Sequence, residues 1–262
     1  MEIYALGTGS AFCLNNFQTN YLIKRNGKNM MVDCGTDARF SVKEAGLTYL
    51  DIDAVYISHA HADHCGGVEW LAFGSYFDPR YQGKPKFFAE RQLLLDLWDH
   101  TLKGGLEGLQ GVDATLETYF DAPVIWKDES FIWEGIEFFL VQSVHITAKY
   151  TLVDSYGLMF TDPDSGKRIY ITTDVQFAPE TSMKAFYQEA DLIIHDCETA
   201  PYQSGVHAHY DQLKTLPDEI KAKMLLTHYQ DNVNEEFEKR AKDDGFLGFA
   251  KKGVIYSSIY TI

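Results

Sequence analysis

The chain has 262 residues, 45% of them hydrophobic, which is enough to bury a sizeable core in a single domain covering residues 1–262. Its 38 acidic and 23 basic residues give a formal net charge of −15, and because such a surface repels polyanions, a nucleic acid is an unfavourable partner. The sequence has no apolar run of the roughly 20 residues that a membrane span needs and no secretory signal, so we expect a cytoplasmic protein without a membrane partner.

The first part of the chain alternates short strand-like runs with a helical pattern. Strands are predicted over 3–6, 20–23 and 30–33, then a helix over 38–45, then a strand over 54–57. This order is typical of an α/β chain.

The middle part of the chain is helical and aromatic. Helices are predicted over 66–73 and over 90–102, where leucines recur at helical spacing and Gly104-Gly105 provide a stop. The aromatic side chains of this part are Phe73, Tyr76, Phe77, Tyr81, Trp98, Tyr119, Phe120 and Trp126. They can stack on one base in a pocket, but for any individual ring a place in the core or in a dimer contact is the preferred interpretation.

Strands return in the last half of the chain. They are predicted over 131–133, 137–141, 150–153, 157–160 and 168–172, followed by a helix over 179–189 and strands over 192–195 and 223–227. Strands with helices between and after them indicate two sheets covered by helices.

The segment from His59 to His64 carries the strongest functional signal. It reads His-Ala-His-Ala-Asp-His, directly after a strand-like run, so four side chains that can bind a metal lie within six residues. Imidazole and carboxylate groups bind zinc at about 2.0–2.2 Å. Alternation along the segment directs His59 and His61 to one ion, and Asp63 and His64 to another. A merely histidine-rich loop is disfavoured, because three of the nine histidines fall in these six positions.

Four later strand-like runs also end in residue types that bind metals. The terminal residues are His145, Asp174, His195 with Asp196, and His228. One such histidine alone is more typical of a hydrogen-bonded core residue. The repetition of the pattern predicts a common site at one edge of the sheets.

These motifs, in their order along the chain, resemble those of the metallo-β-lactamase superfamily and its ribonuclease Z-like branch. The resemblance is carried by Leu6-Gly7-Thr8-Gly9-Ser10, Val32-Asp33-Cys34-Gly35, the segment His59 to His64, His145, Thr173-Asp174, His195 and Leu226-Thr227-His228. It implies an α/β fold in which two mixed sheets are flanked by helices as an αββα sandwich, with a pair of zinc or manganese ions at one edge.

The resemblance also implies a role for each metal-binding residue. The first ion is assigned to His59, His61 and His145, the second to Asp63, His64 and His228, and the bridge between them to Asp174. Asp33 resembles the carboxylate that orients a ligand histidine and fixes its tautomer.

The chemistry implied is hydrolysis by water. Two zinc ions activate a water molecule for in-line phosphoryl displacement, and Asp63 orients or deprotonates that water. A histidine that is not a ligand then protonates the leaving alkoxide. The segment 205–210 resembles the one that supplies this acid, with His207 as first choice and His209 as second. His195 is expected to support a ligand or to take part in catalysis directly.

The substrate follows from a departure from ribonuclease Z. Members that process tRNA carry a long arm between the positions of His145 and Asp174, and here this interval is only 29 residues (174 − 145), which two short strands and a turn over 162–166 fill. The pattern instead looks closest to the anti-Pycsar enzymes of phages and bacteria. This resemblance implies a homodimeric phosphodiesterase that converts 3′,5′-cyclic nucleotides (cyclic CMP and cyclic UMP, with cyclic AMP and cyclic GMP as further candidates) to 5′-monophosphates. It would act against anti-phage signalling, in the host cytoplasm if a phage encodes it.

Three other functions stay open at this stage. They are a tRNA 3′-processing endonuclease, a thioester or lactam hydrolase of the same superfamily, and a non-catalytic zinc protein that sequesters a nucleotide. The last is disfavoured by the presence of both Asp63 and Asp174, because a structural zinc site is usually closed by four ligands.

Overall fold

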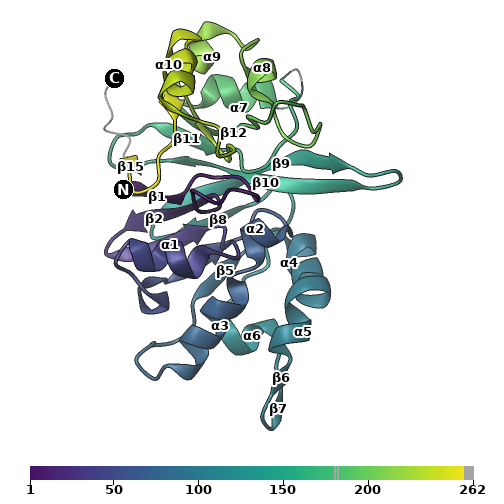
Figure 1. Cartoon of the computed structure of the whole chain (residues 1–262). Helices are drawn as coiled ribbons and strands as arrows, with labels where there is room; N and C mark the ends of the chain where they lie inside the picture. Colours follow the sequence, from purple (N-terminus) through teal and green to yellow (C-terminus); the bar gives the residue numbers. More distant parts are fainter. Residues whose placement is uncertain (180, 182, 257–262) are drawn as a thin grey trace.

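Two β-sheets lie face to face in the computed structural model, and helices cover the outer side of each sheet (Figure 1). The structure describes residues 1–179, 181 and 183–256. Within these residues the first sheet has six strands in the order β15-β1-β2-β3-β4-β5, and the second has seven in the order β14-β13-β12-β11-β10-β9-β8. The predicted αββα sandwich is confirmed.

The first sheet is antiparallel at one side and parallel at the other. Its strands are β1 (Glu2–Gly7), β2 (Asn20–Arg25), β3 (Lys28–Val32), β4 (Ala54–Tyr56), β5 (Lys86–Phe88) and β15 (Ile255–Tyr256). The pairs β3–β4 and β4–β5 are parallel, so these three strands end at the same edge of the sheet.

The second sheet also combines parallel and antiparallel strand pairs. Its strands are β8 (Ser130–Trp133), β9 (Ile136–Thr147), β10 (Leu152–Thr161), β11 (Arg168–Ile171), β12 (Leu192–Asp196), β13 (Met224–Thr227) and β14 (Gly248–Phe249). The run from β11 to β14 is parallel, and β8 to β11 are paired antiparallel.

Alternation along each strand sorts the hydrophobic side chains into separate cores. In β2, Tyr21 and Ile23 belong to the core between the sheets, whereas Leu22 belongs to the core under the helices of the first sheet. In β11, Ile169 and Ile171 face the shared core and Tyr170 faces the helices of the second sheet. Strands that are apolar on both faces, which read as continuous hydrophobic runs, therefore form the middle layers of the sandwich.

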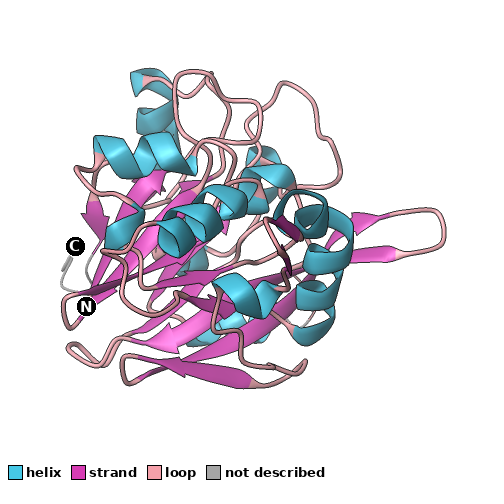
Figure 2. Cartoon of the chain, turned by 90° about the horizontal axis from the view of Figure 1, so that it is seen from below, coloured by secondary structure: helices cyan, strands magenta, loops and turns pink. Residues whose placement is uncertain are grey.

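The helices divide in chain order between the two outer faces (Figure 1), and Figure 2 shows the helices and strands from below. The first face carries α1 (Ala38–Glu44), η1 (Tyr49–Asp51), α2 (Ala62–Cys65), α3 (Val68–Phe77), α4 (Arg91–Leu97), η2 (Trp98–Leu102), α5 (Lys103–Leu106) and α6 (Leu116–Tyr119), with a small hairpin of β6 (Gly108–Leu109) and β7 (Val112–Asp113). The second face carries α7 (Met183–Glu189), α8 (Tyr210–Leu213), α9 (Asp218–Lys221) and α10 (Glu235–Asp243). No helix in the described part of the chain is long and apolar enough to cross a membrane.

The predicted helix stop at Gly104-Gly105 is wrong. The helical path continues from α4 through the π-helical turn η2 into α5, which contains both glycines. A Cβ atom on Gly105 would lie 2.1 Å from Oε2 of Glu69 on α3. Gly105 therefore lies beside the Glu69 carboxylate, and neither glycine ends the helix.

The two strands predicted over 150–153 and 157–160 are one continuous strand, β10. It pairs with the 12-residue β9, and the end of this hairpin projects beyond the body of the molecule (Figure 1). The interval from His145 to Asp174 thus holds the end of β9, the long strand β10 and the short strand β11. In the helix predicted over 179–189, residues 183–189 form α7, and residues 180 and 182 lie outside the described residues.

The aromatic side chains of the middle segment are divided between core and surface. Tyr119 and Phe120 are buried in the core under the helices, and Phe73 and Trp98 pack against that core. For these four rings, the preferred interpretation of a place in the core is confirmed. Phe77, by contrast, is 64% exposed.

Candidate metal centre and catalytic site

The site lies where strands of both sheets end. Asp33 follows β3, His59 follows β4 by three residues, and Asp174 follows β11 by three residues. Asp196 is the last residue of β12, and His228 directly follows β13. The carboxyl ends of parallel strands meet at one edge of a sheet, so polar groups from distant parts of the sequence converge there.

One group of donors is formed by His59, His61, His145 and Asp174. Nδ1 of His61 lies 3.0 Å from Nε2 of His59 and 3.1 Å from Nε2 of His145. Both Nε2 atoms lie 3.6 Å from Oδ2 of Asp174. Donors that share a tetrahedral ion at about 2.0–2.1 Å lie about 3.3 Å apart, so these separations fit a metal ion.

A β-bulge directs His145 into this group. Val153 pairs with Ile146 and Asp154 pairs with Val144, which leaves His145 as an extra residue in β9. Its Nδ1 donates to the carbonyl oxygen of Val206 at 2.9 Å, which leaves Nε2 as the atom with the free lone pair. The bulge therefore sets the direction of a ligand side chain, a common use of bulges beside active sites.

A second group of donors consists of Asp63, His64, Asp174 and His228. Nε2 of His64 lies 3.2 Å from both Oδ2 of Asp63 and Oδ2 of Asp174. Nε2 of His228 lies 3.3 Å from Oδ2 of Asp63 and 3.5 Å from Oδ1 of Asp174. Asp174 thus belongs to both groups, one ligand atom of each member lying within 4.8 Å of the others.

Unpartnered buried atoms support metal binding at these groups. Nε2 of His64 and Oδ1 of Asp174 are buried and make no hydrogen bond. A buried polar atom without a partner costs free energy, which a metal ligand bond would remove. Imidazole and carboxylate groups are donors that bind zinc and other transition metals. The residues present therefore fit a metal ion in each group.

Asp33 lies on the side of the His64 ring opposite to the donors. Its Oδ2 accepts from Nδ1 of His64 at 2.7 Å, which directs Nε2 toward the donors. Its Oδ1 accepts from the backbone N–H of Ser58 at 2.8 Å, and the hydroxyl of Ser58 contacts Nδ1 of His59 at 3.0 Å. A single carboxylate thus orients one ligand directly and another through Ser58.

Three residues of the site have left-handed backbone conformations. Asp33, Thr173 and His228 have φ values of 64°, 53° and 61°, although none of them is glycine. This region is unfavourable for side chains with a Cβ atom, and such strain is concentrated at functional sites. The strained residues lie just past strand ends, where they direct the chain toward the donors.

The pKa values separate the two groups of donors. Burial lowers the pKa of His59, His61 and His145, so these rings are neutral and present lone pairs to a metal. Burial acts in the same direction on His64 and His228, but the negative charge of Asp174 with that of nearby carboxylates raises their pKa well above its usual range. A metal ion must displace protons from this second group.

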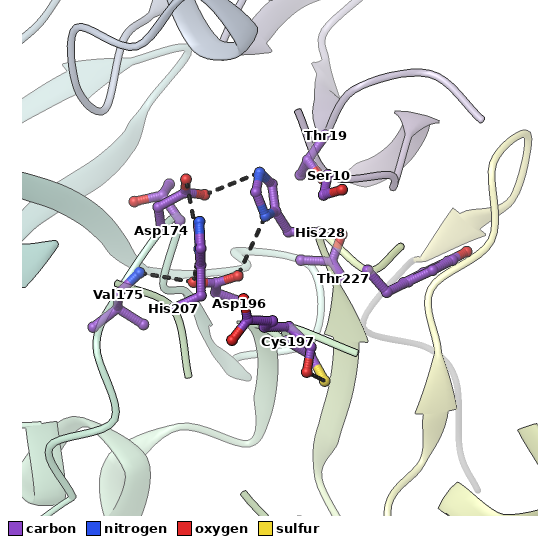
Figure 3. A network of polar contacts seen from close by, with 12 residues as sticks. Ser10, Thr19, Asp174, Val175, Asp196, Cys197, His207, Thr227 and His228 are labelled. Atoms are coloured by element: carbon purple, nitrogen blue, oxygen red, sulfur yellow. Dashed lines mark hydrogen bonds and ion pairs between the residues drawn. The ribbon is translucent and has the colours of Figure 1, made fainter. Parts of the chain in front are cut away.

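The structure also shows the contacts of Asp196, which the sequence analysis placed at a strand end without giving it a role. Figure 3 shows it between two histidines: its Oδ2 accepts from Nδ1 of His207 at 2.8 Å, and its Oδ1 lies 3.4 Å from Nδ1 of His228. The backbone N–H of Val175 donates to the same carboxylate at 2.9 Å. Asp196 is completely buried. The signal that could have identified it is alternation, because adjacent residues at a strand end face opposite sides.

His207 lies beside the donors with its ring held by Asp196. Its Nδ1 is 3.9 Å from Oδ2 of Asp174, and its side chain is 18% exposed. Although burial lowers the pKa of His207, the charges of Asp196 and Asp174 raise it above its usual value. His207 also fits, with Asp174, Asp196 and His228, a third overlapping group of donors. The hydrogen bond to Asp196 favours a proton-carrying role.

The two remaining candidate histidines point elsewhere. His209 is the N-cap of α8, where Nδ1 accepts from the backbone N–H of Asp211 at 3.2 Å and Nε2 donates to the carbonyl oxygen of Ala200 at 2.9 Å. His195 is fully buried between the hydroxyl of Tyr187 and the carbonyl oxygen of Asp196, each at 2.6 Å. Both rings use their nitrogen atoms in structural contacts.

Comparisons with known proteins agree with this site and fold. The family model of anti-Pycsar protein Apyc1 matches residues 1–256. Anti-Pycsar protein Apyc1 of Paenibacillus harenae is 35% identical over 236 residues, which cover 90% of this chain and 92% of the relative.

Two solved structures show the same fold at low identity. A diphosphatase of the PhnP family has a TM-score of 0.77 and 19% identity, covering 98% of this chain and 97% of its own. The metallo-β-lactamase fold protein YhfI from Bacillus subtilis has a TM-score of 0.73 and 20% identity, covering 97% and 98%. The fold, the relatives and the histidine–aspartate donors make this protein a metal-dependent hydrolase. The chain belongs to the anti-Pycsar protein Apyc1 family.

Proposed function

We propose that the protein hydrolyses 3′,5′-cyclic nucleotides, cyclic CMP and cyclic UMP among them, to 5′-monophosphates, and so counters cyclic-nucleotide signalling against phages. The observation that carries the proposal is the position of the Asp196–His207 pair beside two groups of donors that share Asp174. A phosphodiester needs an activated water on one side of phosphorus and a proton for the departing oxygen on the other. The site supplies residues for both tasks, in a cytoplasmic protein that we expect to be a homodimer.

The metal pair is best filled by two zinc ions, with manganese as the alternative. His59, His61 and His145 would hold the first ion and Asp63, His64 and His228 the second, with Asp174 shared. When bound, the pair would lower the pKa of a water molecule and stabilise the oxygens of the transferring phosphoryl group.

Asp63 would then orient the attacking water, and His207 would donate a proton to the leaving oxygen. The pKa of Asp63 lies far below its usual value because the charges of His64 and His228 and their hydrogen bonds outweigh the effect of burial. Ionised Asp63 accepts a hydrogen bond from the attacking water and orients it. His207 keeps Nδ1–H on Asp196 and donates the proton on Nε2 to the 3′-oxygen as the bond from phosphorus to that oxygen breaks. The phosphate then stays on the 5′-oxygen.

The Asp196–His207 pair also favours a phosphodiester over a thioester. A thiolate is a good leaving group and needs little protonation, whereas a ribose alkoxide needs a proton donor. Although burial lowers the pKa of His207, the charges of Asp196 and Asp174 raise it above its usual value, which favours the protonated ring that a general acid requires.

The test is a substrate panel on the metal-loaded protein. Cyclic CMP, cyclic UMP, cyclic AMP, cyclic GMP, a bis(nitrophenyl) phosphodiester and a precursor tRNA are incubated separately, and products are identified by phosphorus NMR and chromatography. We expect 5′-monophosphates from the cyclic nucleotides and no cleavage of the tRNA. Metal analysis of the same sample gives the identity and number of the ions.

Two variants make the panel decisive. Asp63→Ala removes a donor and the water-orienting carboxylate, so it should abolish turnover, whereas His100→Ala changes an exposed histidine on η2 and should leave it intact. Cleavage of precursor tRNA with no turnover of any cyclic nucleotide would contradict the proposal.

A further inference from the structure

Two very exposed aromatic side chains lie on loops that are attached directly to the metal-binding residues. Phe12, between β1 and β2, is 88% exposed, and Tyr202, between β12 and α8, is 68% exposed. Single exposed apolar side chains are ordinary on protein surfaces. These two are notable for their positions on loops tied to the site.

The loop that carries Phe12 is tied to the chain just after His228. The backbone N–H of His228 donates to the carbonyl oxygen of Thr8 at 2.8 Å, and that of Ser10 donates to the carbonyl oxygen of Tyr229 at 3.0 Å. Figure 3 shows Ser10 beside His228. Two residues after Phe12 in the chain, the backbone N–H of Leu14 donates to the carboxylate of Asp231 at 2.8 Å.

The loop that carries Tyr202 is tied to the other group of donors. The carbonyl oxygen of Val206 accepts from Nδ1 of His145 at 2.9 Å, and the loop continues into His207. Nearer to Tyr202, the backbone N–H of Ser204 donates to the buried carboxylate of Glu198 at 2.9 Å.

The segment 229–232 connects these two loops. The hydroxyl of Thr199 contacts the side chains of Gln230 at 2.9 Å and of Asn232 at 2.8 Å. On the other side, Cys13 donates to the carbonyl oxygen of Tyr229 at 3.0 Å. Phe12 and Tyr202 are therefore carried by hydrogen-bonded loops on either side of one short segment, which begins next to His228.

We propose that Phe12 and Tyr202 hold the base of the nucleotide by stacking, while the metal-binding residues hold its phosphate. This assignment rests on the proposed function. A cyclic nucleotide has a charged phosphate, which the donors and His207 can engage, and a flat base, which must be placed outside that polar pocket. Exposed rings on loops fixed to the site suit the base, because every base has a face on which an aromatic ring can stack.

The experiment measures nucleotide binding and turnover separately. The metal-loaded wild-type protein and the variants Phe12→Ala and Tyr202→Ala are titrated with 5′-CMP by calorimetry, and their KM for cyclic CMP is measured. Each variant should weaken 5′-CMP binding and raise KM by roughly 5- to 100-fold, the usual effect of removing a stacked ring. The conservative variants Phe12→Tyr and Tyr202→Phe should bind like the wild type. Phe77→Ala, which removes a ring that is 64% exposed on α3, is the control.

A base-free ribose 3′,5′-cyclic phosphate tests whether the effect comes from the base. Its turnover should be the same in the wild type and in Phe12→Ala and Tyr202→Ala. Unchanged affinity for 5′-CMP in both variants, or a wild-type protein that binds no nucleotide, would overturn the assignment. So would a loss of dimer mass in light scattering with unchanged affinity, since the rings would then be contacts between copies. A wild type that binds 5′-CMP through Phe12 and Tyr202 but hydrolyses no cyclic nucleotide contradicts the proposed function and leaves the stacking assignment intact.

Discussion

Asp174 is the carboxylate that the two groups of donors share, so its removal tests the paired site most directly. Loss of a residue that only orients a ligand typically costs about 10- to 100-fold in metal affinity, and loss of a shared ligand costs more. We expect Asp174→Ala to lose both metal ions and all turnover. Metal analysis by mass spectrometry of the dialysed protein measures the occupancy.

The wild type is the reference for that measurement and should hold two ions per chain. One tightly held ion per chain, with full turnover at that stoichiometry, would argue against the paired mechanism.

His207 and His209 are two residues apart, yet their side chains have different contacts, His207 with Asp196 and His209 with the start of α8. His207→Ala should keep both metal ions and lose roughly 10²- to 10⁴-fold in turnover, as expected when a general acid is removed. The loss should be much smaller for a nitrophenyl phosphodiester, because that leaving group needs little protonation. Steady-state kinetics with the two substrates provide the measurement.

The matched variant is His209→Ala, which removes the cap of α8. It should cost about 0.5–2 kcal/mol of stability and leave the chemistry of the remaining folded protein unchanged. Normal turnover in His207→Ala together with an inactive, folded His209→Ala would show that the acid is assigned to the wrong histidine.

At the scale of elements, the close approach of two loops builds the site, and glycine makes that approach feasible. A Cβ atom on Gly35 would lie 2.2 Å from the carbonyl oxygen of Asp63, where the loop after β3 meets the start of α2. The backbone N–H of Cys34 donates to the carbonyl oxygen of His64 at 2.7 Å in the same contact. A side chain at position 35 must therefore push the metal-binding segment away.

We expect Gly35→Ala to destabilise the metal-free protein by about 1–3 kcal/mol and to weaken metal binding, because backbone must shift to admit the methyl group. The control is Gly104→Ala in α5, where an added Cβ meets nothing within 4 Å. That change should stabilise the protein by about 0.5–1 kcal/mol. Urea unfolding compares the two, and equal stability of Gly35→Ala and wild type would refute the argument.

For the whole molecule, we expect a homodimer. The first sheet is covered by an aromatic-rich layer that leaves Phe77 and Tyr76 of α3 with 64% and 44% of their surface exposed. Apolar surface of this kind is commonly covered by a second copy of the chain. Light scattering at micromolar concentration should give twice the chain mass of 29.8 kDa. A monomeric mass with undiminished activity would exclude a functional dimer.

The sequence alone determined the layers of this protein and singled out most of the residues that the fold brings together as candidate metal ligands. Successive side chains of a strand face opposite sides, so Leu22 lies in one core and Tyr21 and Ile23 lie in another. Because both sides are apolar, these strands can be predicted from continuous hydrophobic runs. The donors of the segment beginning at His59 could be recognised because their chemistry is local and closely spaced. Strand ends then indicated Asp174 as a further donor, since parallel strands end at a common edge.

Only the tertiary structure decided which of two neighbouring polar residues faces the site. It placed Asp196, and not His195, beside His207, because the last residues of β12 alternate between the two faces and register decides which is which. It also showed the bulge at His145 and the continuation of helix through Gly104-Gly105. Side-chain direction at a strand end and the closeness of two backbones depend on contacts between distant segments, and these contacts have no local pattern in the sequence.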